Sequence, residues 1–253
     1  MASSALPNAK RVTLDAPFRW LAAGWGDLAA SIVPCTIYGA LVTMVSVALF
    51  WVLIQSNLAF WALALSCGFV FVAPMLAMGL YEAGRALESG DRPTLARMLF
   101  VRAAFRSDVF YLGLALLLIY LLWGRIAQIV YGLSTYRLHE TVPELAAFAL
   151  NTPEGHVMLI SGAIIGAVMA FFTFSIVLVS APMLLASRAS VFGAIFTSLR
   201  AVSNNFTPAL IWAGLITLML LAAALTGFVA LVVIFPWLGL ASWRAYRDLV
   251  ATP

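Results

Sequence analysis

The stretch PALIWAGLITLMLLAAALTGFVALVVIFPWLGLASW (residues 208–243) decides how many times this chain crosses a membrane. As one helix rising about 1.5 Å per residue it would be about 54 Å long, whereas the hydrocarbon core of a bilayer is about 30 Å thick. Thr226-Gly227, near its middle, is a pair that breaks helices. We therefore predict a tight hairpin of two helices, at 208–225 and 227–243. A single tilted and kinked helix is the alternative.

The composition shows that most of the chain belongs in lipid. Of its 253 residues, 64% are hydrophobic and 9% are charged, whereas soluble domains average about 45–50% and about 25%. Four further apolar runs reach the length of about 20 residues that a transmembrane helix requires. We predict an all-α, polytopic membrane helical bundle in which six transmembrane helices form three hairpins, with the lipid bilayer as its first partner. The four runs lie at 33–54, 58–80, 109–131 and 157–180.

The charged residues indicate which way the bundle faces. With six crossings, 12 of the 14 lysines and arginines lie on one side of the membrane. The other side has two short turns and the loop 132–156, which carries three glutamates. Five crossings would move Arg244 and Arg247 to this acidic side. Because lysine and arginine stay on the cytoplasmic side, we expect six crossings of a bacterial inner membrane, with both termini in the cytoplasm.

The chain is predicted to divide into a cytoplasmic N-terminal segment, 1–32, and a single six-span membrane domain, 33–253. Three cytoplasmic segments have apolar residues at helical spacing, typical of short amphipathic helices that lie in the membrane interface and are attracted to anionic lipid. The first is predicted to start with Asp15 as its cap and Pro17 in its first turn. The apolar faces are Phe18, Leu21, Trp25 and Leu28; Leu95, Met98, Leu99 and Phe105, after a start at 92–94; and Val191, Ile195, Leu199 and Val202.

A proline recurs near the cytoplasmic end of every second predicted span. Within a helix, proline removes one backbone hydrogen bond and introduces a kink. An aromatic ring that follows can lie at the depth of the lipid headgroups, and an arginine can reach phosphate. Alternatively, the three kinks converge on a polar vestibule that opens to the cytoplasm. The residues are Pro74 with Tyr81 and Arg85, Pro236 with Trp243 and Arg247 at the same offsets, and Pro182, which an arginine follows sooner.

Arg125, in LLWGRIAQIVYGL (121–133), is a charge inside the third predicted span. A charge at mid-depth costs about 2.5–3.5 kcal/mol on insertion scales, and less near an interface. Three alternatives stay open: the side chain extends to the outer headgroups, it pairs with a carboxylate of the outer loop, or it serves a ligand or proton pathway. Gln128, one turn later, is a predicted hydrogen-bonding neighbour. The loop carboxylates are Glu140, Glu144 and Glu154.

Little in the sequence points to catalysis or to a cofactor. The two histidines, His139 and His156, lie in the predicted outer loop, so no imidazole is placed within the bilayer to hold haem or copper. The sequence has no Walker loop, no paired-cysteine metal motif and no nucleophile elbow. Its arginines form thin strips that suit lipid headgroups better than nucleic acid. We predict no catalytic residue, no metal, no cofactor and no nucleic-acid partner.

Gly162 and Gly166 form a GxxxG pattern in the fourth predicted span, continued by Ala170. Small residues at this spacing let two helices approach closely. We predict that the contact lies within the monomer. A homodimer, or a contact with another membrane protein, is the alternative.

Four stretches of the chain are distinctive: DAPFRWLAAGWGDL (15–28), VAPMLAMGLYEAGRALESGDRP (72–93), WGRIA (123–127) and FPWLGLASWRAYRDLV (235–250). They resemble a family of bacterial integral membrane proteins filed as domain of unknown function 2189, and the likeness extends over nearly the whole chain. The resemblance implies a membrane bundle and brings no established activity. Typical members have histidines in a GHATWHAYR-like string, where this chain has Leu240 and Arg244, so a role of those histidines does not transfer.

Some members of that family are labelled cytochrome c oxidase subunits. Without histidines in its spans, this chain is expected to be at most an accessory subunit of such a complex. We therefore predict a non-catalytic membrane protein that packs against, assembles or stabilises a larger membrane complex, such as a respiratory one. The alternative is a carrier or channel for a small or lipid-like molecule, using the cytoplasmic vestibule and Arg125; an enzyme ranks third.

Overall fold

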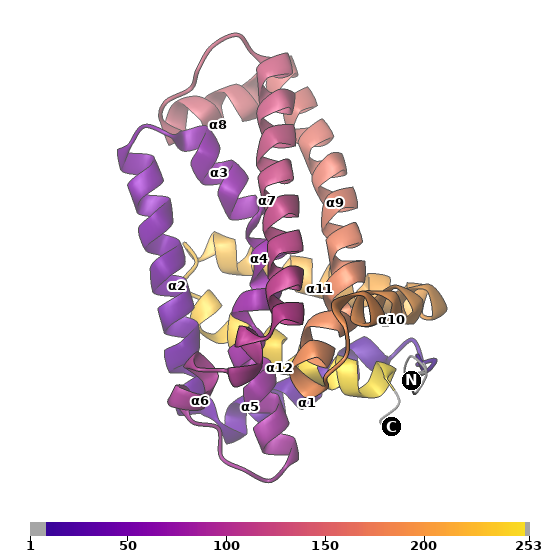
Figure 1. The fold of residues 1–253 in the computed structure, drawn as a ribbon. Helices are drawn as coiled ribbons and strands as arrows, with labels where there is room; N and C mark the ends of the chain where they lie inside the picture. The colour runs from indigo at the N-terminus through magenta and orange to yellow at the C-terminus, as the bar shows by residue number, and fades with distance from the viewer. Residues whose placement is uncertain (1–8, 251–253) are drawn as a thin grey trace. The chain divides into compact units, whose positions relative to one another are not determined.

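Residues 9–250, which the computed structural model describes, fold mainly into helices (Figure 1). The β-structure within residues 9–250 is one isolated antiparallel bridge, between Ala9 and Val250. The prediction of an all-α fold is confirmed. The helices are α1 (Ala16–Ala30), α2 (Ile32–Gln55), α3 (Ala59–Cys67), α4 (Phe69–Leu76), α5 (Met78–Glu88), α6 (Leu95–Leu99), the 3₁₀ helix η1 (Arg102–Phe105), α7 (Ser107–Ser134), α8 (Val142–Asn151), α9 (Pro153–Ala186), α10 (Val191–Asn204), α11 (Phe206–Leu225) and α12 (Leu231–Leu249).

The chain forms two compact units. Unit 1 contains the described residues up to Thr43, Pro74–Gly113 and the described residues from Phe174 onward. Unit 2 contains Met44–Ala73 and Leu114–Thr173. Helices α2, α4, α7 and α9 contribute residues to both units, because each unit boundary falls inside one of them.

Five helical segments in residues 9–250 are long and apolar enough to cross a membrane. Continuous apolar runs produce α2, α7, α9 and α11, and each of these helices overlaps a predicted span. The fifth segment is Phe69–Glu88, which joins α4 and α5. A helical membrane bundle fits these lengths, since a 20-residue helix extends about 30 Å.

Helices α11 and α12 are separated by a turn at 226–230, as the run 208–243 predicts. Gly227 has a φ of +63° and Phe228 a φ of +69°, and the Gly227 N–H donates to the carbonyl of Ala224 at 3.0 Å. Glycine adopts a positive φ without steric cost, which explains why the break includes Gly227. The hairpin of two helices is confirmed, and the single kinked helix is excluded.

Helix α12 carries more charged residues than the other long helices. It has 19 residues and includes Arg244, Arg247 and Asp248 in its last two turns. For this reason it is not among the five segments that are apolar enough to cross a membrane by composition alone. The sixth crossing therefore stays a prediction that rests on other observations.

The second predicted span, 58–80, is wrong in its extent and in its continuity. The structure divides it among α3, α4 and α5, with breaks at Gly68 and Ala77. Pro74 has no N–H to donate and lies three residues before the second break. The helix restarts where the Leu80 N–H donates to the carbonyl of Ala77 at 2.9 Å.

The predicted N-terminal segment 1–32 includes residues 1–8, which lie outside the described residues. The remainder carries α1, which packs chiefly against α12 in unit 1. Asp15 occupies the N-cap position, as predicted, but its side chain makes no capping hydrogen bond and pairs with Arg19 instead. The exposed apolar face of α1 also differs from the predicted one, because Leu28, predicted on that face, is buried.

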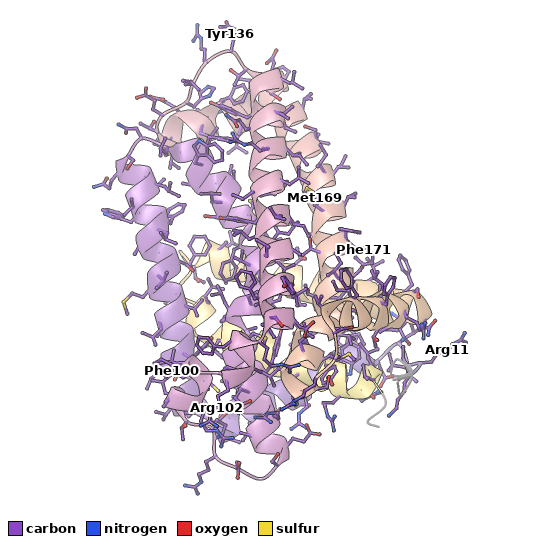
Figure 2. All side chains as sticks on the ribbon, in the orientation of Figure 1. Arg11, Phe100, Arg102, Tyr136, Met169 and Phe171 are labelled. Atoms are coloured by element: carbon purple, nitrogen blue, oxygen red, sulfur yellow. The ribbon has the colours of Figure 1, made fainter. Side chains whose placement is uncertain are left out.

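The predicted interfacial helix at 95–105 is divided into α6 and η1. Thr94 caps α6, as expected, by accepting a hydrogen bond from the Arg97 N–H at 3.4 Å. Phe100 and Arg102 lie just after α6, and Figure 2 shows both side chains projecting outward. Phe100 is largely exposed, which suits contact with the apolar part of a membrane interface.

Helix α10 forms at the predicted position but with a different exposed face. The hydroxyl of Ser190 caps it by accepting a hydrogen bond from the Gly193 N–H at 3.2 Å. Val191 and Val202, predicted on the lipid-facing side, are buried within the protein. The exposed apolar residues are Phe192, Phe196 and Leu199.

The predicted outer loop 132–156 contains helix α8, in unit 2. Thr141 begins it by accepting a hydrogen bond from the Glu144 N–H at 3.4 Å. The helix contributes to a small apolar core with α3, α7 and α9. The buried members of this core are Ala59, Tyr131, Leu145, Ala149 and Met158.

Candidate functional site at helix α12

Helix α12 packs closely against three neighbouring helices of unit 1 because glycine lies at the contact points. A Cβ added to Gly24 of α1 would lie 2.6 Å from the backbone nitrogen of Ala241. A Cβ added to Gly84 of α5 would lie 2.7 Å from the indole ring of Trp243. Both distances are too short for a side chain, so the approach requires glycine. The other two contacts are Gly39 of α2 with Pro236, and Gly239 with Leu80 of α5.

Asp27 on α1 and Arg244 on α12 form a bidentate ion pair. The Nε and Nη2 atoms of Arg244 donate to the two carboxylate oxygens of Asp27, each at 2.6 Å. The Asp27 side chain is 11% exposed, whereas the Arg244 side chain is 33% exposed. The carboxylate thus lies inside the protein and the guanidinium at its edge. Hydrogen bonding to Asp27 raises the pKa of Arg244 above its usual value, which keeps the guanidinium charged.

Two further carboxylates hold the last turns of α12. Glu88, at the end of α5, accepts hydrogen bonds from Trp243 Nε1 at 3.2 Å and from Arg247 Nε at 2.8 Å. Asp248 accepts one from Trp20 Nε1 of α1 at 2.9 Å. Both indole N–H groups are therefore paired although their rings are buried. These contacts fix α12 between α1 and α5.

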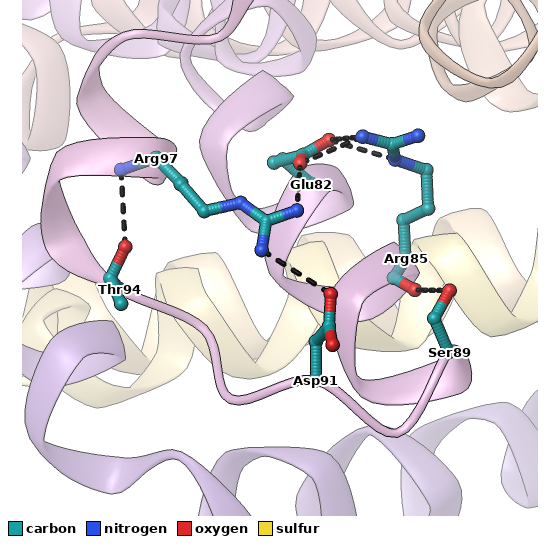
Figure 3. Close-up of polar contacts among 6 residues, drawn as sticks. All are labelled: Glu82, Arg85, Ser89, Asp91, Thr94 and Arg97. Carbon is teal, nitrogen blue, oxygen red and sulfur yellow. Dashed lines mark hydrogen bonds and ion pairs between the residues drawn. The ribbon is translucent and has the colours of Figure 1, made fainter.

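Glu82 of α5 is the centre of a second ionic group, shown in Figure 3. It accepts hydrogen bonds from Arg85 Nε at 2.9 Å and Nη2 at 2.8 Å, and from Arg97 Nη2 at 3.4 Å. Arg97 also donates to Asp91 at 3.4 Å. Glu82 is buried, so the two guanidinium groups supply the charge compensation that its carboxylate needs there. The group joins α5 to the start of α6.

The rings that follow the prolines are buried inside the protein and do not face lipid, and their depth in the membrane stays a prediction. Tyr81 is 5% exposed and Trp243 is 1% exposed. The reason is the close helix packing of unit 1, in which Gly84 leaves room for the indole. Arg85 and Arg247, predicted to reach phosphate, instead form ion pairs with Glu82 and Glu88.

Pro74, Pro182 and Pro236 each lie inside a helix, as predicted. Pro236 packs against Gly39, a contact between helices. Their convergence on a polar vestibule stays a prediction. Unit 1 does carry an apolar surface groove of about 440 Å³, where the rings of Trp25 and Trp237 are 4.8 Å apart. The groove is lined by Phe18, Leu21, Ala22, Trp25 and Trp237.

Arg125 is exposed on α7, in unit 2, and its Nη1 donates to Gln128 Oε1 at 3.1 Å. The predicted hydrogen bond to Gln128 is therefore confirmed. The alternative of a buried ion pair is wrong, since the ion pairs within residues 9–250 do not include Arg125. Its side chain is exposed and forms no ion pair with the carboxylates of the predicted loop. Those carboxylates are Glu140, Glu144 and Glu154.

The two glycines of the GxxxG pattern have different surroundings in unit 2. A Cβ added to Gly166 would lie 3.1 Å from the ring of Trp123, so this residue serves a contact between α9 and α7. A Cβ added to Gly162 would have no atom within 4 Å. The predicted contact within the monomer is thus present at Gly166, and Gly162 lies on an open surface.

The two histidines bind groups of the protein itself. His139 Nδ1 lies 2.8 Å from the hydroxyl of Tyr131, and its ring stacks on Phe148 with centroids 4.6 Å apart. His156 Nε2 lies 2.8 Å from the carbonyl of Leu150. Across residues 9–250, no three side chains of His, Cys, Asp or Glu gather as a metal site would require.

Sequence reasoning missed the acidic partners Asp27, Glu82 and Glu88. A signal for them was present, because a carboxylate in a strongly apolar stretch needs a positively charged partner. Asp27 lies in the stretch 15–28 and the two glutamates in 72–93. The pairs themselves join residues more than 150 positions apart in two of the three cases, so sequence spacing does not reveal them.

Residues 61–186 match the model of a family described as "Predicted integral membrane protein (DUF2189)", and the chain belongs to that family. The match contains helix α4 with Pro74, the ionic group around Glu82 and all of α9. Neither the curated proteins nor the solved structures include a match to this chain.

Proposed function

We propose that this membrane protein is a non-catalytic accessory component that packs against, assembles or stabilises a larger membrane complex, such as a respiratory one. The supporting observation is the uneven burial of its long helices. Within the most apolar 18 residues, 17% of α2 and 22% of α11 are buried inside the protein, against 56% of Phe69–Glu88. Helices α2 and α11 therefore present most of their side chains outward, to another protein or to lipid.

The arrangement of the carboxylates also supports a structural role. Asp27, Glu82 and Glu88 each pair with an arginine of the same unit. Catalytic carboxylates face a substrate site and have a proton to exchange there. Carboxylates that are fully engaged in ion pairs between helices hold those helices in place instead.

We also infer six crossings of a bacterial inner membrane, with both ends in the cytoplasm. The bridge between Ala9 and Val250, with a hydrogen bond from the Lys10 N–H to the carbonyl of Leu249 at 2.8 Å, supports an even number of crossings. Two segments that hydrogen-bond to each other lie on the same side of a membrane. With five long apolar segments already present, α12 supplies the sixth crossing, and the arginine distribution favours the cytoplasmic side.

Native mass spectrometry of the full chain, extracted in a mild detergent, tests the accessory role. We expect a complex in which a second protein is present in fixed stoichiometry. A photo-crosslinking residue at Met44, exposed on α2, is expected to form one discrete adduct with that protein. The same group at Tyr38, buried on the same helix, is the control and is expected to form none.

Two other results would contradict the accessory role. A monomer that retains lipid, with adducts to lipid alone at Met44, would favour a carrier. A particle with the mass of two chains would indicate a homodimer, and Gly162 on its open surface would be the first contact to examine.

The second candidate is a carrier or channel for a small or lipid-like molecule, and the apolar groove beside Trp25 and Trp237 favours it. Replacement of Arg125 by glutamine separates the two functions. Since Arg125 is exposed and bonded to Gln128 alone, we expect the melting temperature in detergent to change little. Transport of a lipid-like substrate into vesicles is expected to fall severalfold if Arg125 serves a pathway. Unchanged transport would remove Arg125 from that role.

A further inference from the structure

The hydroxyl of Ser198, on α10, is inserted against the backbone of α9. It accepts a hydrogen bond from the Val179 N–H at 3.1 Å and donates one to the carbonyl of Ser175 at 2.7 Å. Ser198 is fully buried (0% exposed). The N–H of residue 179 and the carbonyl of residue 175 are the donor and acceptor that pair with each other in a regular α-helix. One side chain of α10 therefore binds both groups of a single helical hydrogen bond of α9.

A backbone hydrogen bond of α9 is missing within the same turn, at Pro182. Pro182 has no N–H, so the carbonyl of Leu178 lacks the donor that a regular helix would supply. The two affected hydrogen bonds, 175–179 and 178–182, are close together along the helix. Proline and a side chain that bonds into the backbone hydrogen-bond ladder are two of the recognised causes of helix kinks. This part of α9 therefore holds its conformation with the help of α10.

One face of helix α10 is apolar and exposed, so it can contact the lipid of a membrane interface. Figure 1 shows it lying crosswise to the last turns of α9, which Ser198 contacts. Phe192 and Phe196 are largely exposed on the side away from Ser198. At its start, the Val191 N–H donates to Asp108 Oδ1 at 2.9 Å. The helix is thus attached at its start, bonded to α9 in its middle, and open to lipid along one face.

We propose that Ser198 is a reversible connection through which α10 docks against α9 beside Pro182. With α10 docked, the hydroxyl bridges the Ser175 carbonyl and the Val179 N–H. When α10 moves away, the Val179 N–H pairs directly with the Ser175 carbonyl, and neither group is left without a partner. Two hydrogen bonds to Ser198 are replaced by one between Val179 and Ser175, and the released Ser198 hydroxyl donates to the carbonyl of Ala194, four residues earlier on α10. No polar group is then left without a partner in the membrane. This inference does not depend on the proposed accessory role.

Replacement of Ser198 by alanine in the full chain, held in lipid nanodiscs, tests the proposal. Docking is read from maleimide labelling of a Thr197→Cys reporter, on the buried face of α10, in a chain with Cys35→Ala and Cys67→Ala. The state of α9 is read from hydrogen exchange of the Val179 amide. We expect labelling to become about tenfold faster, which corresponds to about 1.4 kcal/mol, while the Val179 amide stays as protected as before.

The matched control is Ser203→Ala, on the same helix. Its hydroxyl is exposed and bonds only to the carbonyl of Arg200, so both readouts are expected to stay unchanged. If S198A leaves the labelling rate unchanged, α10 does not depend on the connection and the proposal is wrong. If the Val179 amide loses protection, α9 does not close its own hydrogen bond, and the proposal is equally wrong.

Discussion

Replacement of Arg244 by methionine is expected to lower the free energy of unfolding by about 3 kcal/mol, the low end of what removing one partner of a buried ion pair costs. The change leaves the carboxylate of Asp27 inside the protein without its two hydrogen bonds. The low end applies because the Arg244 side chain is one-third exposed, so water weakens the interaction. Unfolding followed by tryptophan fluorescence, during titration of a denaturing detergent, measures the loss.

Replacement of Asp27 instead of Arg244 is expected to lower the free energy of unfolding by less. Asp27→Asn leaves Arg244 without its partner, but the guanidinium lies at the protein edge and reaches water, so we expect a loss of about 1–2 kcal/mol. The double variant Asp27→Leu with Arg244→Met should regain most of the stability, because two apolar side chains replace the pair. Two results would contradict this explanation: equal stability of the two single variants, or a double variant that is the least stable of the three. Either would show that the unpaired, buried carboxylate of Asp27 does not cause the loss of stability.

Gly24→Ala is expected to destabilise the protein by about 2 kcal/mol, within the range for overpacking a close contact. The added Cβ would meet the backbone of Ala241, which has no flexible end that could move aside. To accommodate it, α1 and α12 must separate, and that movement also lengthens the hydrogen bonds between Asp27 and Arg244. The same detergent titration measures this change.

Gly26→Ala is the matched control, two residues along the same helix. A Cβ at Gly26 has no atom within 4 Å, and alanine is the better helix former, so we expect a gain of about 0.5–1 kcal/mol. Opposite signs for the two substitutions would establish the close approach of α1 to α12. Equal effects would contradict it.

The helical membrane character of the fold could be predicted because it follows from quantities that a sequence contains directly. Apolar runs have a length, and the run 208–243 is longer than a bilayer is thick, so a break near Gly227 was required. The hydrogen bond between Arg125 and Gln128 was likewise predictable, since residues three apart share a helix face. The division of 58–80 at Gly68 and Ala77 was not, because apolarity is the same in a straight helix and in a broken one.

The surroundings of the aromatic residues could not be predicted, for a reason that is particular to membranes. Lipid and protein interior are both apolar, so hydrophobicity does not distinguish a ring that faces lipid from one that faces another helix. Tyr81 and Trp243 were therefore assigned to the interface although they are buried, and Val191 and Val202 on α10 were assigned to lipid although they pack inside. The paired carboxylates were missed because Asp27 and Arg244 are 217 residues apart.

The close packing of α12 has a consequence for how the protein is made. Its glycine contacts are with α1, α2 and α5, all of which leave the ribosome long before α12 does. Until then Asp27 and Glu88 have no arginine from α12, and Gly24, Gly39 and Gly84 face no neighbour from it. These contacts of unit 1 can therefore form only after α12 has been synthesised.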